Sequence, residues 1–368
     1  MSDSIMKEFQ TSKADLTQTR IVETSEQKIT EGEVLVKIER FAFTANNITY
    51  AVMGDYLKYW QFFTPHSDNG EGAEQWGIIP VRGFADVVES NSDEIPIGDR
   101  LFGYLLPADE LVIKPIRVKS TSLMDGSAHR SHLPPSYNLY QRVNNEPGYD
   151  RAHDNSRMLL AVLHLTAFCI QDLLKSNDWY GAEQVVIISA SSKTSIGLGY
   201  GLMDDTDAPT VIGLTSNRNL DFVQSIDAYD SVLSYDELEQ IDASKPTVIV
   251  DMSANTDLLS RLHKHLGDNM RFTSNVGLTH WDEPRQVEGI IRERSEQFFA
   301  PSQIQKLMKE WGAEEFNKQS TRYIMKCAAK TSTWLKVKEL DGVESLSKVY
   351  GDVCAGKIAA DEGLVVVM

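Results

Sequence analysis

The alternation of hydrophobic and polar residues differs between the two parts of the chain. In the segment VLVKIERFAF, which ends at Phe43, hydrophobic and polar positions alternate, and this pattern predicts a half-buried strand. A second β-rich stretch runs from Ile78 to Tyr104 and is broken by a turn. Residues 125–154 lack periodicity, so we expect a surface excursion or linker there. The first third is therefore predicted to be a barrel-like or partly open β domain.

Strands and helices alternate after residue 155. Helical spacing predicts a helix from Met158 to about Lys175. Apolar runs predict strands buried on both faces of a parallel sheet at 184–189 and 245–253. Further strands are predicted at 210–216 and 270–277, and helical segments separate the strands. This order is typical of a doubly wound parallel α/β sheet, here over residues 156–300. The last strand, LVVVM, is expected to pair with the β-rich domain, which would then comprise residues 1–155 and 301–368.

The turn after the first buried strand carries candidate ligands for a phosphate group. It lies between a strand and a helix, so its backbone N–H groups and the helix N-terminus can face an anion. The turn combines hydroxyl groups, one cation and one small apolar residue: Ser189, Ala190, Ser191, Ser192, Lys193, Thr194 and Ser195. The usual G-x-G-x-x-G is absent, so small side chains must permit the close approach that glycine normally allows. Two alternatives are a serine-capped helix without a ligand and a P-loop, which lacks its preceding glycine here.

The end of the second predicted strand distinguishes between two nucleotides. An NAD enzyme usually has a carboxylate there for the adenosine ribose. Here the residues are Thr215, Ser216, Asn217 and Arg218. A guanidinium is a planar, permanent cation suited to a phosphate, and hydroxyl and amide groups add donors. The pattern predicts NADP as the cofactor, through its 2′-phosphate.

On these residues the chain resembles the medium-chain dehydrogenase/reductases, especially their zinc-free quinone-reductase and enoyl-reductase branch. The resemblance covers nearly the whole chain and rests on the order of its segments, among them GFADVVES…IPIGDRLFGY, LTAF, VVIISASSKTSIGLGYGL, TVIGLTSNRN, VIVDMSAN and SNVGLTH. It implies a Rossmann NADP-binding domain inserted in a β-rich, GroES-like substrate domain. It also implies further cofactor contacts at Thr166, Ser253, Asn275, Val276 and Gly277.

The same resemblance predicts that the protein works without a metal. Zinc-dependent members have a cysteine in the substrate loop and a Gly-His-Glu segment. This chain has Asn46-Asn47 in the loop and Arg82-Gly83-Phe84 where Gly-His-Glu is expected. Without such ligands there is no zinc ion to polarise a carbonyl group.

A tyrosine of the substrate loop is the expected proton donor. In zinc-free relatives such a tyrosine often supplies the donor, and this loop holds Tyr50 and Tyr56, with Asn47 as an orienting amide. Either tyrosine can instead be a wall residue whose hydroxyl is satisfied by a neighbour. His280 and Asp282 are a second candidate for moving a proton.

Composition narrows the choice of partners. The chain has 368 residues and a formal net charge of −17, so its surface repels nucleic acid and anionic lipid. The N-terminus lacks the apolar stretch of a signal peptide, and the three cysteines are too far apart for a structural zinc site. We expect a cytoplasmic protein that acts on a small molecule. Relatives commonly dimerise through sheet edges, and the strand at 270–277 is a candidate edge.

The sequence thus predicts an NADPH-dependent oxidoreductase that transfers hydride to a carbonyl, enone or quinone without zinc. The alternative is a catalytically silent protein of the same fold that binds NADPH as a sensor or partner. The divergent serine-rich turn and the lack of a clear acid–base constellation favour this alternative.

Overall fold

The computed structural model describes residues 5–66, 73–277 and 288–368. The chain forms two compact units. The first comprises Met1–Leu159 and Lys336–Met368, and the second comprises Leu160–Leu335. Each unit is described by itself.

The second unit contains a parallel sheet. In chain order its strands are β11 (Gln184–Ile188), β12 (Thr210–Thr215), β13 (Ser231–Ser234), β14 (Thr247–Asp251), β15 (Met270–Asn275) and β16 (Ser295–Gln297). Their order across the sheet is β13-β12-β11-β14-β15-β16, and all pairs are parallel. The strands from β11 to β13 are added toward one edge of the sheet, and those from β14 to β16 are added toward the other edge. This is the strand order of a dinucleotide-binding Rossmann sheet. The predicted fold class is confirmed for this unit.

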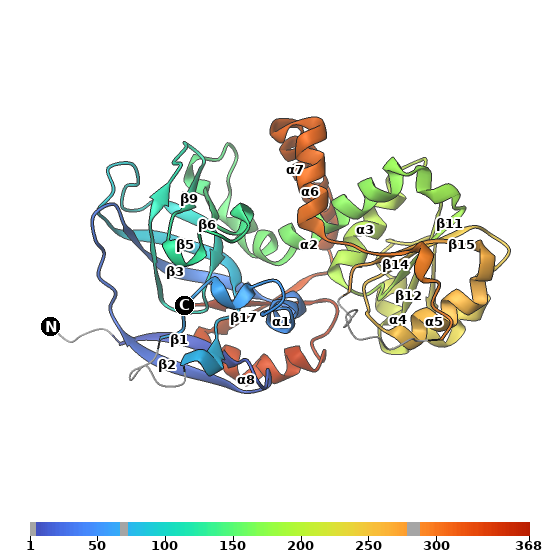
Figure 1. Cartoon of the computed structure of the whole chain (residues 1–368), viewed down its shortest axis with the longest axis horizontal. Helices are drawn as coiled ribbons and strands as arrows, with labels where there is room; N and C mark the ends of the chain where they lie inside the picture. Colours follow the sequence, from blue (N-terminus) through green and yellow to red (C-terminus); the bar gives the residue numbers. More distant parts are fainter. Residues whose placement is uncertain (1–4, 67–72, 278–287) are drawn as a thin grey trace. The chain divides into compact units, whose positions relative to one another are not determined.

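Helices cover both faces of this sheet (Figure 1). Val185 and Ile187 of β11 lie in one apolar cluster with side chains of α2 (Asp154–Ser176) and α3 (Lys193–Met203). The alternate residues, Val186 and Ile188, lie in a second cluster with side chains of α5 (Thr256–Leu266). Because successive strand residues point to opposite faces, an uninterrupted apolar run is the pattern of a strand covered on both sides. The short α4 (Leu220–Gln224) follows β12.

A helical hairpin at the end of the second unit differs from the sequence prediction. The β-rich domain was expected to resume at residue 301, but α6 (Ala300–Trp311) and α7 (Ala313–Thr331) belong to the second unit. Leu307 and Phe316 of this hairpin form an apolar cluster with Cys169 of α2. The Tyr323 hydroxyl of α7 also donates a hydrogen bond to the carbonyl of Gly197 in α3 over 2.8 Å. These contacts tie the hairpin to the helices that cover the sheet.

One helical segment, Arg151–Ser176, is long and apolar enough to cross a membrane by length and composition, within the described part of the chain. Its residues Ala167, Ile170 and Leu174 are fully buried in the cluster that covers β11. The apolar character of this helix is therefore accounted for by packing inside the second unit.

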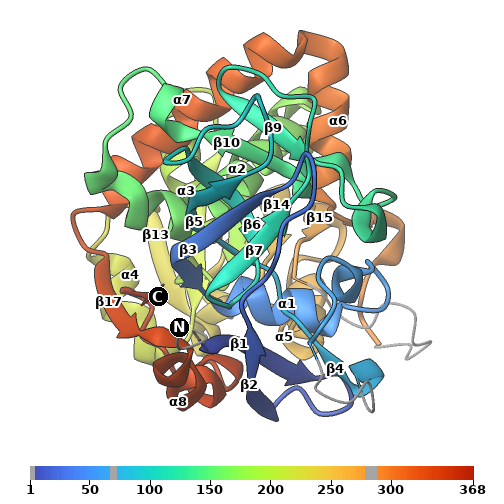
Figure 2. The same cartoon turned by 90° about the vertical axis from the view of Figure 1, so that its left-hand side faces the viewer.

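The first unit is β-rich. Its larger sheet runs, over the described residues, in the order β17 (Lys336–Asp341), β18 (Glu362–Val367), β3 (Val34–Phe43), β5 (Val81–Ser90), β6 (Arg100–Leu105), β10 (Leu139–Arg142), β9 (Ser122–Asp125) and β8 (Pro115–Ile116), with β7 (Glu110–Ile113) pairing β3. A smaller sheet has the order β2 (Thr19–Ser25), β1 (Ile5–Ser12) and β4 (Trp76–Gly77). Figure 2 shows β3, β5 and β6 side by side. This unit also contains the helices α1 (Ala45–Val52) and α8 (Gly342–Cys354).

The C-terminal strand returns to the N-terminal part of the chain, as the sequence predicts. Strand β18 pairs with β3 in antiparallel register, with Leu364 opposite Phe43. Val365 and Val366 are fully buried there. The last apolar run therefore completes the β-rich unit, while the parallel-sheet unit is inserted between its two segments.

The segment 125–154 is more ordered than the expected surface excursion. Strand β10 joins β6 to β9, and its Tyr140 is fully buried. Asp125 and Arg130 form a fully buried ion pair, and Arg130 also donates to the Tyr140 hydroxyl. A sequence pattern cannot reveal this arrangement, because polar residues that resemble a loop are paired with one another in the interior.

Strand β15 is not the edge of its sheet. The short strand β16 pairs with it, with Thr273 opposite Ser295. The half of β15 from Thr273 to Asn275 is therefore not free for a dimer contact, because its outer backbone groups are already paired. The expected homodimer remains a prediction, and β13 and β16 are the strands that end this sheet within the described residues.

Candidate nucleotide site and substrate-loop tyrosines

The predicted cofactor residues of the second unit gather at one edge of its sheet. Ile188, Leu214 and Asp251 lie side by side near the ends of β11, β12 and β14, and Asn275 follows at the end of β15. Because the strands are parallel, the residues after each of them meet at the same carboxyl edge. This edge brings together Ser189–Ser195, Thr215–Arg218, Ser253 and Asn275–Gly277.

The turn after β11 follows a path that usually requires glycine. Ser189 has a φ of 64°, in the left-handed region that non-glycine residues adopt at a cost of about 1 kcal/mol or more. Ala190 is fully buried, its N–H donates to the Leu214 carbonyl over 2.9 Å, and its carbonyl accepts from the Tyr229 hydroxyl over 2.7 Å. The turn is thus fixed by contacts with the neighbouring strand, although the family's glycines are missing.

Helix α3 begins directly at this turn. Ser192 is its N-cap, and the Ser192 hydroxyl accepts a hydrogen bond from the Ser195 N–H over 3.1 Å. An α-helix leaves the N–H groups of its first turn without intrahelical acceptors, and its dipole favours an anion there. Gly197 lets α3 lie close to α2, since a Cβ atom at Gly197 would stand 2.6 Å from the His164 ring. The helix start is therefore positioned firmly at the sheet edge.

The turn after β12 is joined to the first turn. The side-chain amide of Asn219 donates to the Ser191 hydroxyl over 2.9 Å. The amide of Asn217 donates to the Asp236 carboxylate over 2.8 Å. Asp236 follows β13 and is exposed, so a carboxylate does stand near the predicted 2′-phosphate residues. The sequence argument missed it because only the residues after β12 were considered.

The ends of β14 and β15 form the other half of the edge. Asp251 is buried, and its carboxylate accepts from the Ser253 N–H and hydroxyl over 2.8 and 2.7 Å. Burial is the main influence on this carboxyl and raises its pKa above the ordinary value. The Asp251 carbonyl accepts from the N–H groups of Val276 and Gly277 over 2.8 and 2.9 Å. A Cβ atom at Gly277 would stand 2.8 Å from the Ala254 nitrogen, so this position needs glycine.

Two buried polar atoms at this edge lack partners within the described residues. They are the Thr215 hydroxyl and the Asn275 side-chain oxygen. Thr215 is fully buried, and Asn275 is 2% exposed. Buried polar atoms are normally hydrogen-bonded, so such atoms indicate an absent water or ligand. The edge therefore fits a polar ligand at the place where the sequence predicts the nucleotide.

Thr166 lies apart from these loops in chain order, on α2. Its hydroxyl donates to the Val162 carbonyl one helical turn earlier, over 3.0 Å. The side chain is half-buried, and its suggested place near the nicotinamide stays a prediction.

The substrate-loop residues lie in the first unit, on or beside α1. Asn47 accepts from the Thr44 N–H over 2.8 Å and donates to the Pro80 carbonyl over 2.9 Å, so it fixes the start of α1. Tyr50 is 7% exposed, and its hydroxyl lies 2.6 Å from the Tyr104 hydroxyl. Tyr56 is 70% exposed. The structure thus brings Asn47 and Tyr50 into one ordered segment and leaves Tyr56 at the surface. His280 and Asp282 lie outside the described residues.

Tyr50 belongs to a cluster of tyrosines that sequence analysis did not identify. Its ring centre lies 4.6 Å from that of Tyr59, and the Tyr59 hydroxyl lies 2.8 Å from that of Tyr137. Burial is the main influence on Tyr59, Tyr104 and Tyr137 and raises the pKa of each well above its ordinary value. These hydroxyls stay protonated at neutral pH. Tyr59, Tyr104 and Tyr137 come from three separate segments of the chain, so no local sequence motif could have revealed the cluster.

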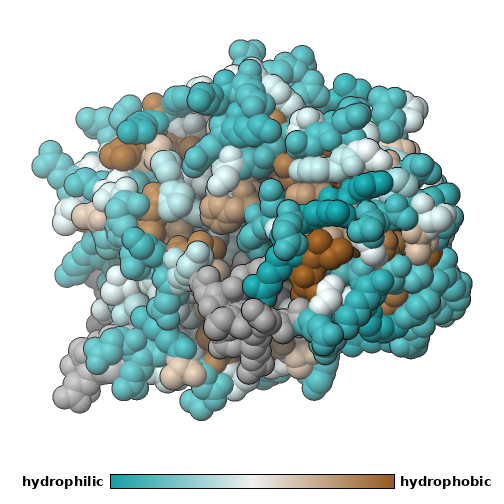
Figure 3. Space-filling model, turned by 45° about the vertical axis from the view of Figure 1, so that its right-hand side comes forward, coloured by the Kyte–Doolittle hydropathy of each residue, from teal (hydrophilic) through white to brown (hydrophobic). Residues whose placement is uncertain are grey.

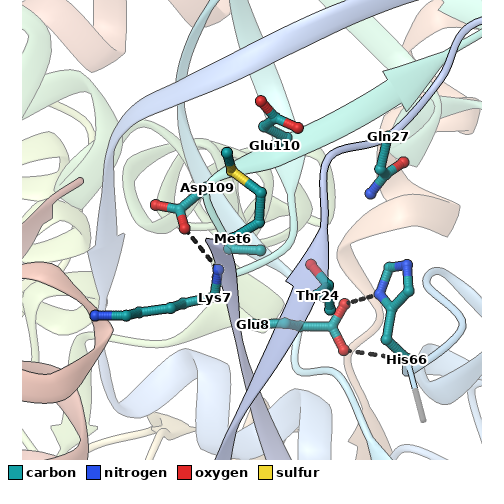
Figure 4. A pocket seen from close by; sticks show the side chains of 9 residues that line it. Met6, Lys7, Glu8, Thr24, Gln27, His66, Asp109 and Glu110 are labelled. Carbon is teal, nitrogen blue, oxygen red and sulfur yellow. Dashed lines mark hydrogen bonds and ion pairs between the residues drawn. The ribbon is translucent and has the colours of Figure 1, made fainter. Parts of the chain in front are cut away.

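Two hollows in the first unit contain none of the predicted site residues. One of about 10 Å³ is lined by Glu8, His66, Asp109 and their neighbours (Figure 4), which is room for about one water molecule. There the Glu8 carboxylate pairs with the His66 ring over 2.6 Å, so this buried acid is already compensated. The other is an open depression of about 420 Å³ beside Trp60 and His129. Both hollows lie in the first unit, whereas the residues predicted to bind the nucleotide lie in the second unit.

The face in Figure 3 is mostly hydrophilic, with hydrophobic side chains in separate groups. No group of three or more histidine, cysteine, aspartate or glutamate residues is arranged to hold a metal ion within the described residues.

Comparisons with known proteins agree with this geometry. The sequence matches the family model described as "Protein of unknown function (DUF2855)" over residues 41–359. No curated protein matches it. CurA from Vibrio vulnificus in complex with NADPH is 13% identical with a TM-score of 0.60, covering 98% of this chain and 99% of that chain.

Two further solved structures show the same likeness. A quinone oxidoreductase from Coxiella burnetii is 14% identical with a TM-score of 0.56, over 99% of this chain and 100% of that chain. A putative NADPH:quinone reductase from Bacillus thuringiensis is 11% identical with a TM-score of 0.60, over 99% of each chain. The chain therefore shares the fold of these solved reductases, which is the fold that the sequence resemblance implied.

Proposed function

The chain belongs to the DUF2855 family, and we propose that it is an NADPH-dependent oxidoreductase that reduces a carbonyl, enone or quinone-type small molecule without zinc. The observation that supports this most is the sheet edge of the second unit. There the start of α3, the turn after β12 and the unpartnered oxygens of Thr215 and Asn275 come together. Solved structures of the same fold include two in complex with NADPH, which supports the choice of nucleotide.

The proposal gives the edge residues separate tasks. The N-terminus of α3, with Ser191, Ser192 and Thr194, binds the pyrophosphate through N–H and hydroxyl donors. Ser216, Asn217 and Arg218 bind the 2′-phosphate, for which a guanidinium is the best-matched side chain. Ser253 and residues 275–277 line the path toward the nicotinamide.

The chemistry needs a hydride and a proton. NADPH, when bound, supplies the hydride from its nicotinamide ring. Tyr50 is the proposed proton donor, because it carries a phenol hydroxyl on α1, in the predicted substrate loop. The Tyr104 hydroxyl oxygen lies 2.6 Å from the Tyr50 hydroxyl oxygen, and this contact orients the Tyr50 hydroxyl group. Tyr56 is the second candidate for the donor, and Asn47 fixes the loop that carries both.

The test is NADPH consumption with a panel of quinones, enones, ketones and aldehydes. The proposal predicts NADPH oxidation with at least one class and a fall of roughly 100-fold in kcat for Tyr50→Phe, the usual effect of losing a general acid. Tyr56→Phe is the matched variant for the surface tyrosine. NADPH binding without oxidation of any compound would contradict the reductase and support the catalytically silent NADPH-binding alternative. A cytoplasmic homodimer is part of the same proposal, checked by fractionation and by light scattering.

A further inference from the structure

Arg82 of the first unit is a half-buried cation without a hydrogen-bonding or acidic partner among the described residues. It lies on β5 directly opposite Tyr104 on β6. Its guanidinium carbon stands 4.5 Å from the centre of the Tyr104 ring and 5.9 Å from that of Phe102. Its Nε atom is wholly buried and makes no hydrogen bond in the part of the chain that is described. The side chain is held by aromatic faces, and its buried Nε donor is left unused.

Most other buried or half-buried arginines of this unit are compensated by carboxylates, and Arg20, which donates to the Gln10 side-chain oxygen over 2.8 Å instead, is an exception. The pairs are Arg100 with Asp86 and Asp154, Arg130 with Asp125, Arg142 with Asp99, and Arg157 with Glu146. Removing a guanidinium from water without an anion is costly, which explains why this pairing is the rule. Arg82 departs from that rule although it lies on the same strand as Asp86. A cation kept in this way is suited to an anion that arrives from outside.

Arg82 is also connected to the proposed proton donor. Tyr104, whose ring lies under the guanidinium, places its hydroxyl 2.6 Å from that of Tyr50. One side chain therefore links the unpaired cation and the tyrosine hydroxyl. A molecule held by Arg82 through one end would lie beside the hydroxyl pair of Tyr50 and Tyr104.

We propose that Arg82 is a specificity-determining residue that binds a carboxylate of the substrate, so that the substrate class is a carbonyl or enone compound carrying a carboxylate group. The proposal rests on the proposed function. A guanidinium offers parallel N–H donors that match the two oxygens of a carboxylate. The protein has a net charge of −17, which repels anions at long range, so local binding of one requires a dedicated cation.

The test compares acids with their methyl esters. The pairs are trans-4-oxo-4-phenylbut-2-enoate, trans-4-oxopent-2-enoate and 4-oxopentanoate, each beside its methyl ester. Binding is measured by calorimetry without nucleotide, and reduction is measured separately with NADPH. Arg82→Gln should weaken binding of the preferred acid at least tenfold and leave its ester unchanged, while Arg82→Lys should have an intermediate effect. Arg20→Gln is the matched control, because Arg20 also stacks on an aromatic ring, that of Trp76, at 4.3 Å.

The outcomes separate this proposal from the reductase itself. Wild-type protein that binds no acid better than its ester, or Arg82→Gln that weakens acid and ester equally, overturns the carboxylate site. A loss of NADPH affinity in Arg82→Gln with unchanged acid binding also overturns it, because the anion would then belong to the nucleotide. Acid binding that depends on Arg82 without any NADPH oxidation keeps the site and removes the reductase. Thermal unfolding of each variant shows whether it is folded.

Discussion

The side-chain amide of Asn219 donates a hydrogen bond to the hydroxyl of Ser191 over 2.9 Å. This bond joins the turn after β11 to the turn after β12, the two segments that are proposed to hold the pyrophosphate and the 2′-phosphate. In a site without the usual glycines, such a cross-link maintains the spacing between the two anion-binding turns. Preorganisation of this kind lowers the cost of ordering loops on binding.

Removal of this cross-link is expected to weaken nucleotide binding more than folding. Asn219→Ala deletes one hydrogen bond worth about 1 kcal/mol, which corresponds to roughly a fivefold loss in NADPH affinity. Calorimetry measures the affinity, and thermal unfolding measures stability. Asn177→Ala is the matched control, because this exposed amide caps the end of α2 by donating to the Leu173 carbonyl. Equal NADPH affinity in Asn219→Ala and wild type would show that the cross-link has no part in the site.

Asp236 is expected to oppose the 2′-phosphate. Its carboxylate accepts from the Asn217 amide over 2.8 Å and is exposed. Asp236→Asn removes a negative charge beside the proposed phosphate, so NADPH affinity should rise about threefold at low salt while NADH affinity falls or stays constant. Glu183→Gln, at the opposite edge of the sheet before β11, is the control. A fall in NADPH affinity for Asp236→Asn would mean that this acid helps to bind the nucleotide.

The parallel-sheet unit was predictable because its strands carry an unusually direct signal. The run from Val185 to Ile188 is apolar at every position, as burial on both faces requires. Strand β16 was missed because it has three residues, Ser295–Gln297, and all of them are polar. The sequence placed α6 and α7 in the β-rich domain, which is wrong. An amphipathic pattern indicates that one face of a helix is buried, but it does not indicate which element covers that face.

The chemistry of the site was less predictable than its location. The position of the serine-rich turn follows from the strand before it. Arg82 packs on the ring of Tyr104, which comes from another strand. The carboxylate beside Asn217 is that of Asp236, which comes from the segment after β13. Such pairings arise from folding together residues distant in sequence, and one chain without aligned relatives carries no local trace of them.

Gly267 is expected to be essential for the end of α5. It has φ 52° and ψ −126°, a conformation that side chains rarely adopt, and no atom lies within 4 Å of an added Cβ. Gly267→Ala should therefore destabilise the protein by about 1–2 kcal/mol through backbone strain alone. Gly351→Ala, at an exposed helical position of α8 with equal open space, should stabilise it by about 0.5–1 kcal/mol. Chemical denaturation of both variants checks the opposite signs.

His263 is expected to make stability sensitive to acid. Burial lowers the pKa of His263 to about 4, and its ring accepts a hydrogen bond from the Ile291 N–H over 3.0 Å. The unfolded chain takes up a proton below pH 6.5 while the folded protein stays neutral until about pH 4. Stability is complete above pH 6.5 and falls through this window, by about 3 kcal/mol at full effect.

The variant His263→Gln should be less stable at pH 7 but lose less stability between pH 6.5 and pH 4. His132→Gln, which changes an exposed ring, should keep the wild-type slope. Urea denaturation at several pH values measures these slopes. An unchanged slope in His263→Gln would show that other groups cause the acid sensitivity.

The central claim is that the carboxyl edge of β11, β12, β14 and β15 binds NADPH. Calorimetric titration of the wild-type protein with NADPH and NADH, repeated with Arg218→Ala, tests it directly. The account predicts selective binding of NADPH by the wild type, and at least a tenfold weaker NADPH affinity in Arg218→Ala with NADH affinity unchanged. Binding of neither nucleotide by the folded wild-type protein would contradict it.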